Sequence, residues 1–193
     1  YLEKAKELTE YVLKYFIDEE TGYFYFTPDG QKDIIVRKKE VYDGAVPSGN
    51  SVMAFKLHYL GIIYDQENWK QQSVKMLSGL QKAIVRYPGS FGVWAGEVLN
   101  FIRGYNELVI IGIDYQIRRD QLLSGYLPNL VIQAASEGNR NFPLLKEKTT
   151  EYGETVFYLC RQYVCLTPTS NPLIIQDILS ETTHYTIKQT TNR

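Results

Sequence analysis

Residues 37–51 read RKKEVYDGAVPSGNS, and an apolar helical pattern follows them directly over residues 51–63. Two glycines and one proline between Asp43 and Asn50 disfavour a regular helix in this segment. The segment therefore places charged and polar side chains on a backbone with few available conformations, which is typical of a binding or catalytic loop. Ser48 and Asn50 are also candidates for the N-cap of the helix that follows.

Helical periodicity extends outward from this segment on both sides. Apolar side chains recur at helical spacing over residues 1–18, 51–63, 66–86 and 91–103. Short connections join the later helices, which favours antiparallel helical hairpins. The first connection is long, and it contains the aromatic run 23–26, a Pro-Asp-Gly turn at 28–30 and the apolar run 34–36, so we expect a β-hairpin there.

After Gly104 the pattern changes to that of a small α/β element. Apolar runs at 108–111, 130–134 and 156–164 are strand candidates, and Asn171-Pro172 begins a last helix to Leu179. The strand, helix and strand over 108–134 lack the glycine-rich loop of a dinucleotide site, and Asp114 would repel phosphate. We therefore expect helical hairpins over 1–104, an α/β appendage with the final helix over 105–181, and a disordered tail over 182–193.

The composition excludes several classes of function. Lys and Arg number 21 and Asp and Glu 22, and this balance argues against a dedicated binder of nucleic acids or acidic membranes, which would need a basic surface. No apolar run is long enough for a membrane span, and no signal peptide is evident. Two His and two Cys show no zinc spacing, so we expect no metal and no cofactor. These features favour a cytoplasmic location, and the missing initial Met suggests a piece of a longer protein.

Two carboxylates of the segment, Glu40 and Asp43, are candidates for the general acid and base of a sugar hydrolase. Candidate ligand-binding residues are those with polar groups in the same segment and one tryptophan that could stack on a sugar: Arg37, Ser48, Asn50 and Trp94. In the alternative interpretation Arg37 pairs with Glu40 or Asp43, and the other polar groups fix the loop and cap the helix.

The two cysteines, Cys160 and Cys165, are five residues apart. On one regular strand an odd spacing places side chains on opposite faces. A disulfide or a shared metal would therefore need a turn between them, and Arg161-Gln162 is polar enough to form one. The alternative is that both are small buried apolar side chains.

Three stretches resemble the C-terminal part of a family of thioredoxin-domain-containing proteins that includes spermatogenesis-associated members. They are residues 37–51, residues 107–112, and residues 158–165 with Pro168 after them. The resemblance implies a mainly α fold, an incomplete (α/α) toroid of the six-hairpin glycosidase type, with a β-hairpin in one connection and a small α/β element near the C-terminus. The thioredoxin domain of that family lies outside this sequence.

Two functions stay open at this point. The toroid implied by the resemblance favours binding or processing of a carbohydrate, although fold analogy alone does not establish a function. The alternative is a non-catalytic scaffold or interaction module whose partner is the remainder of a larger protein or a second copy of the chain. The residues leave open whether the chain is an enzyme.

Overall fold

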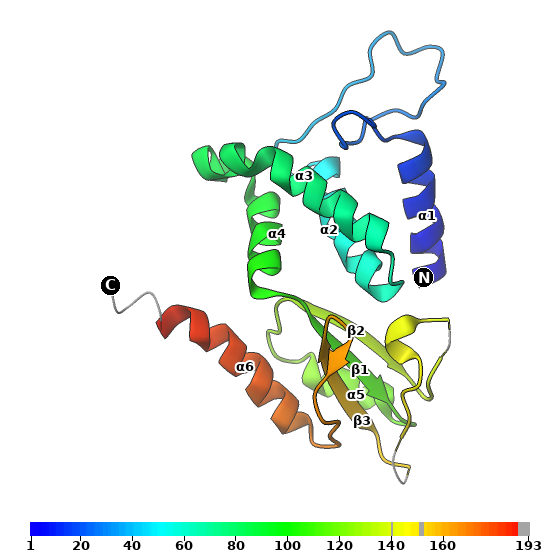
Figure 1. Ribbon diagram of the computed structural model, residues 1–193, viewed down its shortest axis with the longest axis vertical. Helices are drawn as coiled ribbons and strands as arrows, with labels where there is room; N and C mark the ends of the chain where they lie inside the picture. The colour runs from blue at the N-terminus through cyan, green and yellow to red at the C-terminus, as the bar shows by residue number, and fades with distance from the viewer. Residues whose placement is uncertain (140, 151–152, 189–193) are drawn as a thin grey trace. The chain divides into compact units, whose positions relative to one another are not determined.

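The structure is a computed structural model that describes residues 1–139, 141–150 and 153–188, with side chains described up to residue 180. The chain divides into two compact units, Tyr1–Ile102 and Arg103–Arg193 (Figure 1). The first unit is helical, and the second contains a four-stranded sheet. Each unit is described by itself below.

Four helices form the first unit: α1 (Leu2–Tyr15), α2 (Gly49–Ile63), α3 (Glu67–Arg86) and α4 (Gly92–Arg103), with a short 3-10 turn η1 (Pro88–Ser90) before α4. The helices α2 and α3 form a hairpin and pack along each other (Figure 1). Buried residues of α3 recur at helical spacing, at Trp69, Ser73, Met76, Leu77 and Ile84. Each large apolar side chain buried in this way stabilises the fold by about 1.5–3 kcal/mol.

The long connection between α1 and α2 is irregular. The predicted β-hairpin over residues 23–36 is wrong, because among these residues only Phe24 forms a bridge, and its partner is Ile17. One further backbone hydrogen bond, from Phe26 N–H to the Lys38 carbonyl, joins the two arms of the loop. An aromatic run favours a strand, but here it lacks a second strand of matching register.

The second unit is a mixed sheet with helices. Its elements in chain order are β1 (Asn106–Ile111), α5 (Tyr115–Leu122), β2 (Leu130–Ala135), a 3-10 turn η2 (Pro143–Leu145), β3 (Val156–Arg161), β4 (Val164–Cys165) and α6 (Pro172–Lys188). The strand order is β2-β1-β3-β4. Strand β1 runs parallel to β2 and antiparallel to β3, so every residue of β1 is buried. A central strand that is buried on both faces usually has a continuous apolar sequence, and residues 108–111 have such a sequence.

One face of the sheet packs against α5 and α6 in a single apolar core. Its buried members are Leu108, Ile110, Leu122, Phe157, Leu159, Ile175 and Leu179. After β1 the chain passes so close to the start of β3 that a Cβ atom on Gly112 would lie 2.6 Å from Thr155 Cα. Asn171 caps α6 by accepting from the Leu173 N–H at 3.0 Å.

The mainly α toroid expected from the sequence is wrong. The four-stranded mixed sheet gives the chain an α/β content that a ring of helical hairpins does not have. The α2–α3 pair does form a hairpin, but the region after residue 104 is a unit of its own with its own core. The last helix also continues to Lys188, past the predicted end at Leu179, and residues 189–193 of the predicted tail lie outside the described residues.

Candidate functional site

Asp43 lies at the centre of the polar segment defined by residues 37–51. Its Oδ1 accepts from the Ser51 hydroxyl at 2.6 Å and from the Ser48 N–H at 3.0 Å. Its Oδ2 accepts from the Val93 N–H at 2.9 Å, at the start of α4. Burial of Asp43 favours the neutral acid, but these donors outweigh it and lower the pKa of the carboxyl below its ordinary value. Asp43 is therefore an ionised carboxylate that joins the loop to the first turns of two helices.

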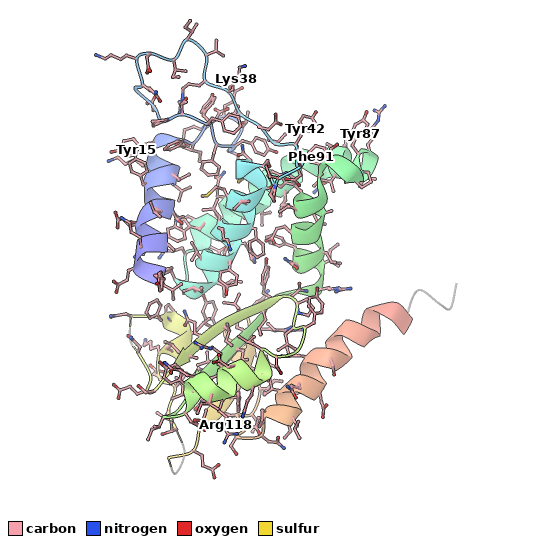
Figure 2. The ribbon with its side chains drawn as sticks, turned by 180° about the vertical axis from the view of Figure 1, so that it is seen from behind. Tyr15, Lys38, Tyr42, Tyr87, Phe91 and Arg118 are labelled. Carbon is pink, nitrogen blue, oxygen red and sulfur yellow. A yellow bond between two sulfur atoms is a disulfide. The ribbon has the colours of Figure 1, made fainter. Side chains whose placement is uncertain are left out.

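Glu40 makes local contacts with the backbone that follows it. Its Oε1 accepts from the N–H groups of Val41 and Tyr42, both at 2.9 Å. The Tyr42 ring packs at 5.2 Å from the Phe91 ring, which Figure 2 shows beside it. The two candidate carboxylates, Glu40 and Asp43, thus each bind backbone N–H groups of the first unit.

Arg37 contacts the loop that precedes the segment. Its guanidinium donates to the Thr27 carbonyl at 2.8 Å and to the Tyr15 carbonyl at 3.2 Å, and it stacks over the Tyr25 ring at 4.0 Å. The carboxylate within ion-pair distance is that of Asp29, at 3.6 Å. The alternative in which Arg37 pairs with Glu40 or Asp43 is therefore not what the structure shows.

Asn50 connects three parts of the chain. Its Oδ1 accepts from the Phe24 N–H at 2.7 Å, and its Nδ2 donates to the carbonyls of Phe24 and Glu40 at 2.9 and 2.8 Å. Ser48 is the N-cap of α2, because its hydroxyl accepts from the Ser51 N–H at 3.0 Å. The polar atoms of both side chains thus form hydrogen bonds with backbone groups of the same unit.

Trp94 has an exposed fraction of 0%. Its Nε1 donates to the Val41 carbonyl at 2.8 Å, and its ring packs edge-on against Tyr23 at 6.3 Å. The ring faces are therefore covered by protein, and the indole links α4 to the polar segment.

The polar segment as a whole joins backbone groups that are far apart in the sequence. Its side chains reach Phe24 in the first connection and Val93 in α4, and the indole of Trp94 returns to Val41. Hydrogen bonds to buried backbone groups contribute stability because an unpaired buried N–H or C=O is costly. The arrangement can hold a long loop in one conformation.

The two cysteines, Cys160 and Cys165, form a disulfide in the second unit. They are register partners across the antiparallel strands β3 and β4, which a two-residue turn at Gln162 and Tyr163 connects. The turn that a bridge between these cysteines requires is present at Gln162 and Tyr163, one residue later than the Arg161-Gln162 pair considered for it. Among the described residues, no group of three or more His, Cys, Asp or Glu is placed to hold a metal ion.

Sequence reasoning missed the role of Glu107 and Lys148. Glu107 is buried at the start of β1, and its carboxylate accepts from the N–H groups of Gln162 and Tyr163 at 3.0 and 2.9 Å. The signal was available, because a carboxylate that opens an apolar strand needs a partner. Lys148 lies with its ammonium 3.3 Å from Cys165 Sγ, and nothing in its sequence context indicates this contact.

Described residues of the second unit line a larger and a smaller hollow. The larger, about 580 Å³, lies beside the end of β1 and between residues 136–139 and 146–150, and Lys148 lines it. The smaller, about 260 Å³, contains Asp114, whose carboxylate accepts from Thr155 and from Arg118. Figure 2 shows Arg118 on α5. The Thr155 and Arg118 donors lower the pKa of Asp114 although partial burial opposes them.

Within the described ranges, no helix combines the length and the apolar character that crossing a membrane requires.

Comparisons with known proteins give one group of relatives. No protein-family model matches the chain, and no solved structure matches it significantly. Spermatogenesis-associated protein 20 of human is 26% identical over 190 residues, which cover 93% of this chain and 24% of the relative. The rat and mouse proteins of the same name are each 26% identical over 192 residues, which cover 94% of this chain and 24% of theirs. The chain is thus similar to these proteins along most of its own length, and it spans about a quarter of theirs.

Proposed function

We propose that the chain is a non-catalytic scaffold and interaction module, and that its partner is another part of a longer polypeptide. The observation that carries this proposal is the set of hydrogen bonds of Asp43, which binds three donors from the loop, α2 and α4. A general acid or base needs a carboxyl group that can exchange a proton with a substrate. The oxygens of Asp43 are instead both used to join parts of the fold.

The loop that this network holds presents apolar side chains outward. Ile35 is 99% exposed, Val36 is 68% exposed and Val46 is 73% exposed. Exposed apolar residues next to one another often mark an interaction surface. The relatives are about four times as long as the matched region, so a covering segment from the remainder of a longer protein is consistent with their size.

The test replaces the carboxylate while keeping its shape. Asp43→Asn gives the buried site an amide in place of two acceptor oxygens, so we expect the free energy of unfolding in urea to fall by about 1–3 kcal/mol. Asp33→Asn, at an exposed position of the same loop, is the control and should unfold as the wild type does. The wild-type chain should bind and hydrolyse no member of a panel of oligosaccharides and aryl glycosides.

The competing hypothesis is that the chain binds or processes a carbohydrate. It is supported if the wild-type chain hydrolyses or binds a sugar, and if Asp43→Asn abolishes that activity with an unchanged free energy of unfolding. The cytoplasmic location expected from the sequence stays a prediction, which fractionation of cells that express the whole protein can check.

A further inference from the structure

The disulfide between Cys160 and Cys165 lies at the end of the β3–β4 hairpin. The two residues are directly opposite each other, with their Cα atoms 3.8 Å apart, which is closer than the usual 4.4–6.8 Å of disulfides. Cys160 is 2% exposed, whereas Cys165 is half-buried on the two-residue strand β4. A thiolate in solution can therefore approach Cys165 more easily than Cys160.

A positive charge lies next to the accessible sulfur. Lys148 Nζ is 3.3 Å from Cys165 Sγ and 5.0 Å from the centre of the Tyr158 ring. The Tyr158 hydroxyl donates to the Thr149 carbonyl at 2.7 Å, which attaches the loop that carries Lys148 to β3. An ammonium gains little from a neutral disulfide, but it stabilises a thiolate. The contact therefore favours the opened form of the bridge.

The hairpin keeps a second connection when the bridge opens. Gln162 and Tyr163 both have positive φ, at 49° and 63°, which is the conformation of a two-residue type I′ hairpin turn. Their N–H groups donate to the buried carboxylate of Glu107 on β1. The turn is thus fixed to the sheet by groups other than the sulfurs, and reduction can take place in the folded protein.

We propose that Cys160–Cys165 is a thiol–disulfide exchange site, which a dithiol reductant opens in the folded chain. One thiolate of the reductant attacks Cys165 Sγ, the S–S bond breaks, and Cys160 leaves as a thiolate and takes up a proton. The second thiolate of the reductant then attacks its own sulfur in the mixed disulfide and expels the Cys165 thiolate beside Lys148. The reductant becomes a disulfide, and its two electrons reside on the two cysteine sulfurs.

The experiment uses the whole oxidised chain and dithiothreitol as the dithiol. Samples are held without denaturant at a series of reduced-to-oxidised dithiothreitol ratios, quenched with acid, and labelled with a polyethylene glycol maleimide in guanidinium. We expect both thiols to become labelled while circular dichroism shows an intact fold. A bridge that opens only when guanidinium unfolds the chain overturns the proposal.

Matched lysine variants test the part played by the ammonium. Lys148→Gln should slow opening several-fold, and Lys148→Arg should restore the rate because it restores the charge. Lys146→Gln is the control, since Lys146 is exposed and its ion pair is with Glu147. Equal opening rates for wild type and Lys148→Gln would remove Lys148 from the mechanism.

Single-cysteine variants identify the sulfur that is attacked. The free Cys165 of the Cys160→Ser variant should react with iodoacetamide faster than the free Cys160 of the Cys165→Ser variant. The reverse order would contradict the assignment of Cys165 as the site of first attack. Both variants keep the Glu107 contacts, so both are expected to fold.

Discussion

Asp18 lies just beyond the end of α1, where its carboxylate binds the ammonium of Lys39 and the hydroxyl of Thr21. These two donors hold the pKa of Asp18 at about 2, although burial opposes them. The Lys39 ammonium also lies 4.9 Å from the Tyr25 ring, on which Arg37 stacks. This ion pair thus connects the residue that follows α1 to the polar segment, in addition to the hydrogen bond from Arg37 to the Tyr15 carbonyl.

The contribution of the Asp18–Lys39 ion pair to the stability of the fold depends on pH. Because the folded pKa lies below the ordinary value of 3.8, ionised Asp18 stabilises the fold above about pH 4, and this contribution is lost as the pH falls towards 2. We expect Lys39→Gln to lower the urea unfolding midpoint at pH 7 and to flatten its decline between pH 4 and pH 2. Lys38→Gln, at an exposed neighbouring position that Figure 2 labels, is the control. Parallel acid profiles for wild type and Lys39→Gln would contradict this assignment.

At the scale of residues, the sequence indicated polar groups of the first unit that need partners, but not what they contact. Ser48 as an N-cap follows from its position before an apolar helical pattern. The partners of Asn50 and Asp43 include Phe24 and Val93, which no spacing rule connects to them. A hydrogen bond between distant segments is a product of the tertiary fold, so the residue type alone indicates only that a partner is needed.

Among the elements, the β3–β4 hairpin depends on a residue outside it. Its turn residues, Gln162 and Tyr163, are not the Asn-Gly pair that usually indicates a type I′ turn. Glu107 on β1 compensates by accepting both turn N–H groups. This contact joins residues far apart in the sequence. Local signals therefore predicted residues 156–164 as one strand, and they offered a turn at Arg161-Gln162 only as a condition for a bridge between the cysteines.

Removal of the Glu107 carboxylate should loosen the turn without unfolding the sheet. For Glu107→Ala we expect the amide hydrogens of Gln162 and Tyr163 to exchange about tenfold faster, which corresponds to roughly 1.4 kcal/mol for the lost contact. NMR-detected hydrogen exchange measures this directly. Glu154→Ala, at an exposed position before β3, is the control and should leave both amides unchanged. Unchanged protection in Glu107→Ala would show that the disulfide alone fixes the turn.

On the scale of the whole molecule, each unit has its own apolar interior. The first buries side chains such as Leu57, Met76 and Trp94 between its helices, and the second buries both faces of β1. Sequence patterns predicted the helices of the first unit, the strand β1 and the helix α6, because long periodic or apolar runs are the clearest signals. The toroid that the resemblance implied was wrong, because the chain after α4 forms a mixed sheet and not further helical hairpins.

A substitution in one core should affect that unit first. Gly112→Ala would place a methyl group against the Thr155 backbone, so we expect the second unit to lose about 1–3 kcal/mol. Hydrogen exchange followed by mass spectrometry should then rise in β1, β2 and β3 and stay constant in α2 and α3. Gly125→Ala, where an added Cβ meets no atom within 4 Å, is the control. An equal loss of protection in α2 and α3 would show that the two units unfold together.

The central position of β1 also sets an order in which the second unit can be completed during synthesis. Its parallel partner β2 follows after one short helix, but its antiparallel partner β3 emerges only after the long segment that contains η2. Until then, one edge of β1, whose residues 108–111 are all apolar, has unpaired N–H and C=O groups, which is the arrangement that recruits other chains. A nascent chain of this protein therefore passes through a stage in which it needs shielding from its neighbours, and that stage ends when Val156–Arg161 pairs with β1.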